Sequence, residues 1–274
     1  MNDAYFEMMK AGMKASGMSD EQIEAALNAQ KASMQSMMNF AQGAQDLGAG
    51  MMEKLAGLNM DSYFEFADPS TLSPSDQWAV ACGADLIHLR ADIINDLTSG
   101  SDADLCKEML AEQWGIKNKK QFMEMAESLM AGRHSKIYSQ IAKGKVPEDF
   151  EDEAENFQEA MEQFAQDKLI KPGKAPDMAA WDLGRLINIS RFAFDAKMIS
   201  REEALDLIRK AALEMKKHYK SWKELSVAYQ FGRAVWGGMD GSYEEMKEGM
   251  EQLLEEEDSP WVTLPFDMKL DFQA

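Results

Sequence analysis

The residues best suited to chemistry gather in one apolar stretch of the chain, AAWDLGRLINISRFAFDAKMISREEAL, which spans residues 179–205. On a helix, Trp181 and Arg185 would be four residues apart, so that the guanidinium could stack on the indole ring. Asp182 and Arg185 would be three residues apart, within reach of an ion pair. Arg191 follows on the same segment. The spacing therefore predicts either an anion-binding site built from arginines or a network of buried charges.

Aliphatic and aromatic residues fill most other positions of this stretch, which predicts a central helix buried on most sides. An unpaired buried charge is costly, so buried arginines need partners, and Asp195 lies four residues after Arg191. We favour the structural interpretation, in which these arginines hold the helix to its neighbours. The alternative is a pocket for an anion or a partner carboxylate that uses Arg185, Arg191 or Arg233.

Other catalytic or metal chemistry has little support in the sequence. His88, His134 and His218 are the three histidines, and no HExxH, CxxC or repeated ExxH pattern surrounds them. Glu214 and His218 would share a helix face, but two ligands do not make a zinc site. A GxSxG turn and a glycine-rich phosphate loop are also missing from the sequence. We therefore predict no catalytic residues, no metal and no cofactor.

The elements that must position these residues are helices. A capping residue followed three positions later by an acid or an amide recurs along the chain, as at helix N-termini. The pairs are Ser19/Gln22, Ser73/Asp76, Ser101/Asp104, Asn118/Gln121, Ser200/Glu203, Ser221/Glu224 and Ser242/Glu245. Phe150, Phe157 and Phe164 recur every seven residues with acids on the opposite face, and no convincing strand pattern occurs. The sequence predicts an all-α fold.

Charge and composition narrow the class of protein further. The chain has 48 acidic and 29 basic residues, a formal net charge of −19, which disfavours nucleic acid and anionic membranes as partners. No run approaches the ~18 apolar residues of a membrane helix, and the N-terminus lacks the pattern of a signal peptide. Cys82 and Cys106 lie among apolar residues, as buried thiols do in a reducing compartment. We expect a cytoplasmic protein.

The composition changes near residue 60, because residues 1–60 hold 11 of the 23 methionines and none of the six tryptophans. We predict a Met-rich helical extension over residues 1–65 and an all-α domain over residues 66–274. Methionine-rich faces adapt to varied apolar helices, so one face of the extension is the predicted partner-binding surface. That face comprises Ile23, Leu27, Met34, Met37 and Met38. We favour the alternative that it packs on its own domain or on a second copy, as amphipathic helices usually do.

Several motifs together resemble a bacterial family, the domain-of-unknown-function 1266 family. They are LAEQWGIKNKKQF, AWDLGRLINISRFAFDAKMISREEAL, KSWKELSVAYQFGRAVWG and SPWVTLPF, which fall within residues 75–266. The positions that match the family pattern are Trp181, Asp182, Arg185, Arg191, Glu202, Glu203, Ala204, Ser221, Trp222, Gly232, Arg233, Trp236, Ser259, Pro260 and Trp261. The family often has Gly-Tyr before the Ile-Ser of the turn, where this chain has Lys-Met. Its activity is not established, so the resemblance implies a fold more than a function.

Two functions remain open at this point. The leading hypothesis is a non-enzymatic cytoplasmic interaction protein that binds a basic protein partner or an apolar helix, with a homo-oligomer also compatible. The alternative is an enzyme or small-ligand binder with an arginine-lined pocket near the Trp181–Arg191 helix. In either case the residues expected to form the ligand site or the structural ion-pair cluster are Trp181, Asp182, Arg185, Arg191, Trp222, Arg233, Trp236 and Trp261.

Overall fold

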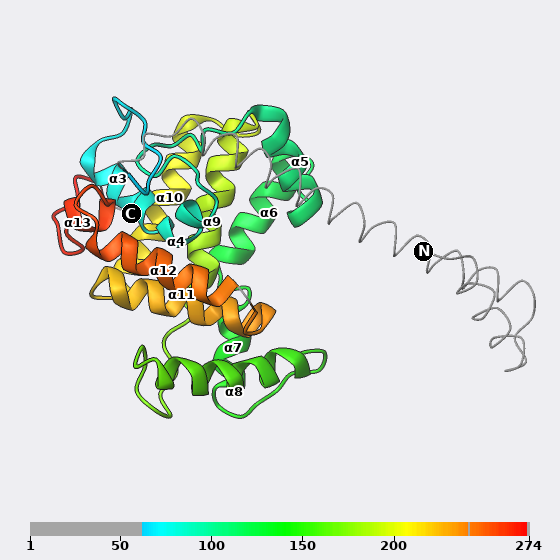
Figure 1. Cartoon of the computed structure of the whole chain (residues 1–274). Coiled ribbons are helices and arrows are strands. Elements are labelled where there is room, and N and C mark those ends of the chain that lie inside the picture. Colours follow the sequence, from blue (N-terminus) through cyan, green and yellow to red (C-terminus); the bar gives the residue numbers. More distant parts are fainter. Residues whose placement is uncertain (1–61, 241, 273–274) are drawn as a thin grey trace, which may run out of the picture. The chain divides into compact units, whose positions relative to one another are not determined.

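The computed structural model of the protein describes residues 62–240 and 242–272 (Figure 1). Residues 62–274 form one compact unit, which is the domain described here. The methionine-rich face predicted to bind a partner lies outside the described residues. Phe64 is buried in the domain core, and the Glu65 carbonyl accepts a hydrogen bond from the Ile94 N–H at 2.8 Å. The domain thus includes the last residues of the predicted extension.

The described unit is helical, as the sequence predicts, and no strand occurs within residues 62–240 and 242–272 apart from an isolated bridge between Glu65 and Ile93. No helix in this part of the chain is both long and apolar enough to cross a membrane. The helices are α3 (Pro74–Ala81), α4 (Ala84–Leu89), α5 (Ala103–Trp114), α6 (Lys119–Met130), α7 (Ser135–Ile141), α8 (Glu151–Gln166), α9 (Ala179–Asp195), α10 (Arg201–His218), α11 (Trp222–Gly237), α12 (Ser242–Glu255) and α13 (Pro260–Thr263).

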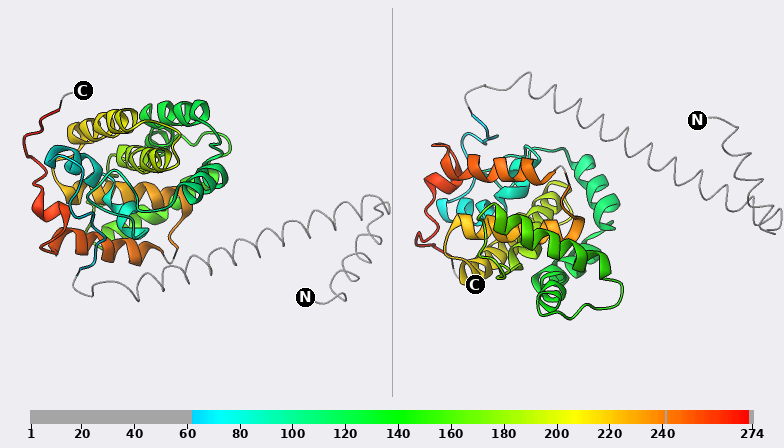
Figure 2. Two further views of the ribbon diagram at one scale, coloured as in Figure 1. Left: turned by 90° about the horizontal axis from the view of Figure 1, so that it is seen from above. Right: turned by 60° about the horizontal axis from the view of Figure 1, so that its bottom comes forward.

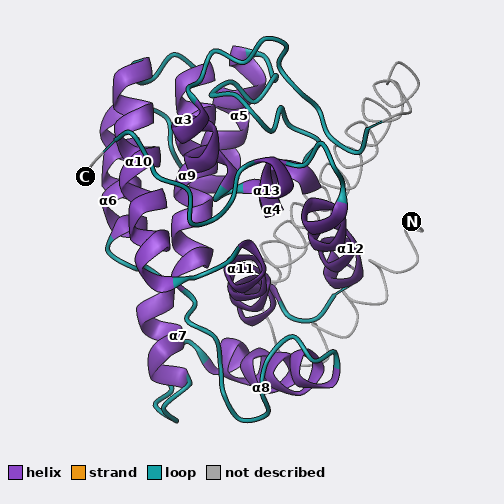
Figure 3. Cartoon of the chain, turned by 90° about the vertical axis from the view of Figure 1, so that its left-hand side faces the viewer, coloured by secondary structure: helices purple, strands orange, loops and turns teal. Residues whose placement is uncertain are grey.

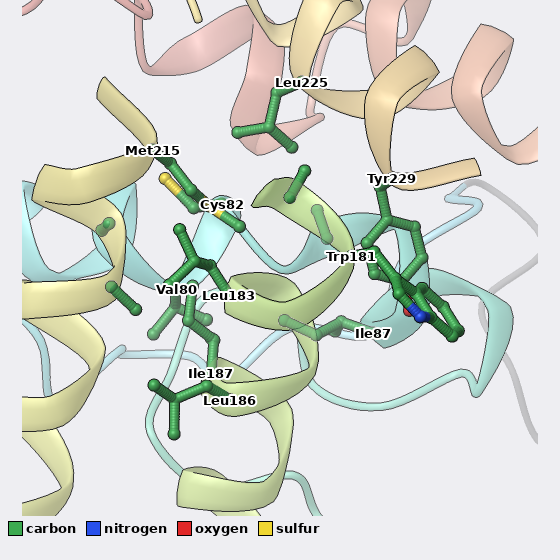
Figure 4. Packing of buried hydrophobic residues seen from close by; sticks show 14 of the residues in the cluster. Val80, Cys82, Ile87, Trp181, Leu183, Leu186, Ile187, Met215, Leu225 and Tyr229 are labelled. Carbon is green, nitrogen blue, oxygen red and sulfur yellow. The ribbon is translucent and has the colours of Figure 1, made fainter. Parts of the chain in front are cut away.

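Helix α9 lies at the centre of the unit, in contact with α10, α11, α5, α6 and α4 (Figures 1 and 3). Every residue from Ala180 to Ala193 is buried, because apolar side chains point from α9 in all directions. Side chains of α4, α10 and α11, with Val80 of α3 and Cys82 just after it, gather around Leu183, Leu186 and Ile187 (Figure 4). The predicted central, buried helix is thus present.

Small residues let α11 approach α9 closely. A Cβ added to Gly232 of α11 would lie 2.5 Å from the Cβ of Trp181, and one added to Gly184 of α9 would lie 3.0 Å from the Tyr229 ring. Real Cβ atoms do not come within 3.0 Å of their neighbours. The position of the indole of Trp181 therefore depends on the absence of a side chain at Gly232.

Four of the eleven helices in the described residues begin at the cap that the sequence predicts. In four cases the predicted side chain accepts a hydrogen bond from the backbone N–H three residues on, namely at Ser73, Asn118, Ser200 and Ser221. The prediction for Ser101 is wrong, because Asp102 caps α5 instead. Ser and Asp are comparable caps, so two adjacent candidates differ only in register. Helix α12 begins at Ser242 itself, and Ser19 lies outside the described residues.

The C-terminal segment is fastened to the domain by an aromatic cluster. Trp222 of α11 stacks on Trp261 of α13 with ring centroids 5.6 Å apart, and it also contacts Trp78 and Phe266. The two indole N–H groups donate to backbone carbonyls, from Trp222 to Leu264 and from Trp261 to Ala81. All four rings are buried, so this cluster serves packing.

Candidate functional site

Asp182, Arg185 and His134 form a buried polar cluster at the start of α9. Arg185 donates from Nη2 to Asp182 Oδ1 at 2.9 Å and from Nε to the Trp181 carbonyl at 2.8 Å. Its guanidinium carbon lies 4.0 Å from the centroid of the Trp181 ring. The predicted ion pair and the predicted stacking are both present. Asp182 is wholly buried and Arg185 is 7% exposed, so water does not supply their hydrogen bonds.

His134 completes this cluster from the turn between α6 and α7. Its Nδ1 lies 2.8 Å from Arg185 Nη2 and 3.1 Å from Asp182 Oδ1. A ring nitrogen carries either a proton or a lone pair, so it makes one of these bonds at a time. Nδ1 accepts from Arg185 in the ring that is protonated on Nε2 alone, and it donates to Asp182 when Nδ1 carries a proton. Sequence reasoning missed this residue.

The carboxylate of Asp182 also fixes the position of α7. Its Oδ2 accepts from the backbone N–H groups of His134 at 3.0 Å and of Ser135 at 2.8 Å, at the N-terminus of α7. Burial alone would raise the pKa of Asp182, but these bonds, the His134 ring and the Arg185 charge hold that pKa below its usual value. Asp182 is therefore a charged group that ties α9 to α7.

Trp236 and Arg233 extend this cluster towards the surface at the end of α11. Trp236 is 52% exposed and its ring centroid lies 5.9 Å from that of Trp181. Arg233 donates to Asp240 Oδ2 and to the Ser242 hydroxyl, each at 2.8 Å. This arginine is thus paired across the turn that joins α11 to α12.

Arg191 lies apart from the other predicted residues and bonds backbone carbonyls instead of an acid. It is fully buried, and its guanidinium donates to the backbone carbonyls of Ile93, Leu97 and Thr98, at 3.3 Å for Leu97 and 2.7 Å for Thr98. Asp195, the expected partner, instead accepts from the N–H and hydroxyl of Ser99, each at 2.7 Å. Arg191 therefore holds the loop between α4 and α5 by bonding the backbone carbonyls of that loop.

The eight residues predicted as one set consequently fall into three places. Trp181, Asp182, Arg185, Arg233 and Trp236 lie along the α9–α11 contact. Arg191 lies at the α4–α5 loop, and Trp222 and Trp261 lie in the aromatic cluster of the C-terminal segment. Spacing in the sequence identified these residues but did not show that they lie at three separate places in the fold.

A pocket of about 630 Å³ lies beside Asp182, between α7 and the adjoining ends of α6, α9 and α10. Its lining comprises Leu129, Met130, Ala131, Gly132, Ser135, Lys136, Ser139, Gln140, Lys143, Asp177, Ala179, Asp182, Leu183, Glu214 and His218. Apart from His218, its basic side chains are two lysines, so this pocket is not lined by arginine. His218 lies 2.8 Å from Asp177 and 3.5 Å from Glu214, the residue expected to share its helix face.

The described part of the chain contains no arrangement of side chains suited to metal or thiol chemistry. No group of three or more His, Cys, Asp or Glu side chains is placed there to hold a metal ion. Cys82 and Cys106 are free and buried, and burial raises the pKa of Cys106 to about 11. A thiol that stays protonated at neutral pH is a poor nucleophile.

The fold and the cluster define an all-α domain built around a buried Trp-Asp-x-x-Arg helix. A family model described as "Protein of unknown function (DUF1266)" matches residues 109–266, and the chain belongs to this family. The match begins within α5, so α3 and α4 lie before it. Comparisons with curated proteins and with solved structures found no match to the chain.

Proposed function

We propose that this protein acts in the cytoplasm as a non-enzymatic interaction protein whose partner is a basic protein. The observation that carries the proposal is a continuous acidic face on α8. This helix exposes Glu151, Asp152, Glu155, Glu159 and Glu162, and it contains no lysine or arginine. The apolar side of α8 packs on the core, where Phe157 and Phe164 contact Phe231 of α11.

Helix α12 carries a second set of exposed acids. Figures 1 and 3 show α8 and α12 on either side of α11, and the right-hand view of Figure 2 brings α8 forward. Tyr243 of α12 packs on Phe164 of α8 and donates to Asp167, which connects the two helices. The exposed acids of α12 are Glu244, Glu245, Glu248, Glu251 and Glu255. We call the exposed acids of α8 and α12 the acidic face.

Electrostatics supports a cationic partner for the acidic face. Like charges spread over two helices create a potential that speeds the encounter with an oppositely charged protein and repels nucleic acid. Many surface acids in this chain are not balanced by a neighbouring base, as the net charge of −19 indicates. The predicted apolar face of residues 23–38 would add a second, helix-binding contact and stays a proposal of the same kind.

The alternative of an enzyme with an arginine-lined pocket has less support. Arg185 and Arg191 donate to Asp182, His134 and backbone carbonyls inside the core, and the one Arg191 nitrogen without a hydrogen-bond partner among the described residues, Nη1, is fully buried. Arg233 is engaged by Asp240. An arginine that recognises a substrate needs donors that are free to reach it.

Affinity capture with charge variants tests the proposal. The tagged full chain is compared with a variant in which Glu151, Glu155, Glu159 and Glu162 of α8 are changed to Gln. A matched control carries the same four-charge change on α5 and α6, in exposed Glu108, Glu112, Glu124 and Glu127. We expect the wild type and the control to capture the same basic protein from extract of the source cells, and the α8 variant to lose it. Equal capture by all three chains, or capture of acidic proteins only, would refute the proposal.

A further inference from the structure

One wall of the pocket beside Asp182 carries basic side chains. Helix α7 presents Ser135, Lys136 and Ser139 to the pocket, and Lys143 joins them from the turn just after the helix. Both lysines are exposed, and no hydrogen bond or ion pair within the described residues engages their ammonium groups. A lysine that lacks a partner at a concave surface is free to bind an anion.

The sequence around α7 is basic within an otherwise acidic chain. No acid occurs between Glu127 and Glu148, while this stretch contains Arg133, Lys136, Lys143 and Lys145. The loop with Lys171 and Lys174 lies against the C-terminal end of α7, because Ala142, Pro172 and Gly173 line one common hollow. An anion approaching this side of the molecule therefore meets positive charge.

The acids on the opposite wall already have partners. Asp182 is held by Arg185 and the N-terminus of α7. Asp177 contacts His218 at 2.8 Å, and Glu214 contacts Lys217 at 2.6 Å. The charged groups at the pocket left without a hydrogen-bond or ion-pair partner among the described residues are consequently the ammonium groups of Lys136 and Lys143.

The remaining lining is apolar and the volume suits a small molecule. Leu129, Met130 and Leu183 supply aliphatic and thioether surface. A volume of about 630 Å³ falls within the range of small-molecule sites. We propose that this pocket binds an anionic small molecule with an apolar body, whose oxyanion group contacts Lys136 and Lys143 and whose body packs on Leu129, Met130 and Leu183. The site uses no residue of the acidic face and does not depend on the proposed protein partner.

Titration with 8-anilinonaphthalene-1-sulfonate, an apolar ring system that carries one oxyanion, tests this site in the full chain. Its neutral analogue N-phenyl-1-naphthylamine reports whether the charge is needed. Lys136→Gln/Lys143→Gln removes the charges, and Ser139→Trp fills the pocket while keeping them. The matched control is Lys117→Gln/Lys120→Gln, which removes two exposed charges from the start of α6 and the residues before it. The methyl ¹³C resonance of Met130, assigned with Met130→Leu, reports where the probe binds.

We expect the sulfonate to bind the wild type and the control equally and to shift the Met130 resonance. The dissociation constant should rise about tenfold in the double lysine variant, because each exposed charge contact contributes a factor of a few. Binding to Ser139→Trp should be lost, and the neutral analogue should bind about tenfold more weakly. The proposal is overturned if both pocket variants bind the sulfonate as the wild type does, if Met130 does not respond, or if the neutral analogue binds equally well.

Discussion

Replacing Arg191 with Met removes the charge and all donors of a fully buried guanidinium while keeping a long, flexible side chain in its place. Arg191 donates to the carbonyls of Ile93, Leu97 and Thr98 in the loop between α4 and α5. These carbonyls would lose their partners inside the protein. The substitution thus separates an arginine that supports the fold from one that serves a ligand.

The magnitude follows from these contacts. A buried polar group left without its hydrogen bond costs about 1–3 kcal/mol, so three carbonyls would cost several kcal/mol. The methionine variant no longer has to bury a charge, which offsets part of this loss. We expect a net loss of about 3–5 kcal/mol in the free energy of unfolding, the lower part of the range of about 3–9 kcal/mol for three buried carbonyls left without partners.

Urea denaturation followed by tryptophan fluorescence measures this loss, since all six tryptophans lie between residues 78 and 261. Arg201→Met is the matched control, because Arg201 also donates to a loop, at Thr71, but from a partly exposed position. The control should lose less than about 1 kcal/mol. A stability of Arg191→Met within about 1 kcal/mol of the wild type would show that Arg191 does not hold the loop.

Three further predictions concern a buried acid, a helix contact and the extension. Burial raises the pKa of Asp85 from 3.8 to about 6. The contribution of Asp85 to stability is therefore complete below pH 3.8 and is lost as the pH rises through 6. In urea titrations from pH 3.8 to 6, the free energy of unfolding of Asp85→Asn should rise relative to that of the wild type by up to about 3 kcal/mol. Gly232→Ala should lower stability by about 1–3 kcal/mol because its Cβ meets Trp181, whereas Gly237→Ala, which meets only the flexible end of an arginine, should not; equal effects would contradict the close approach. Deleting residues 1–61, which keeps the buried Phe64 and the hydrogen bond between Glu65 and Ile94, should leave a folded domain by circular dichroism but change its oligomeric mass or its captured partners, and an insoluble product would assign the extension to the core.

Local spacing allowed part of the site to be predicted from the sequence. Trp181, Asp182 and Arg185 contact one another because residues three and four apart share a helix face, and this rule needs no knowledge of the fold. Four helix starts were predicted on the same basis, since a cap lies beside the residues it serves. The error at Ser101 shows the limit of that basis, because the adjacent Asp102 is an equally suitable cap.

Contacts between distant segments could not be predicted in this way. His134 meets Asp182 across 48 residues, and the pairing depends on how α7 packs against α9. The partners of Arg191 are carbonyl groups, which every residue carries, so no side chain in the sequence marks them. Asp195 had the right spacing for Arg191 but lies against Ser99. The pocket formed by α6, α7, α9 and α10 likewise exists only once the four elements meet.

The most direct test of the proposed function is the dissociation constant of the captured basic protein, measured by fluorescence anisotropy against the wild type, the α8 variant and the α5–α6 control. The account predicts equal affinity for the wild type and the control. It also predicts a loss of at least about thirtyfold for the α8 variant, since four charge contacts at about 0.5 kcal/mol or more each amount to about 2 kcal/mol. The affinity of the wild type should fall as salt is raised, because exposed charges are screened. Equal constants for all three chains, unchanged by salt, would contradict the assignment of the acidic face as the binding surface.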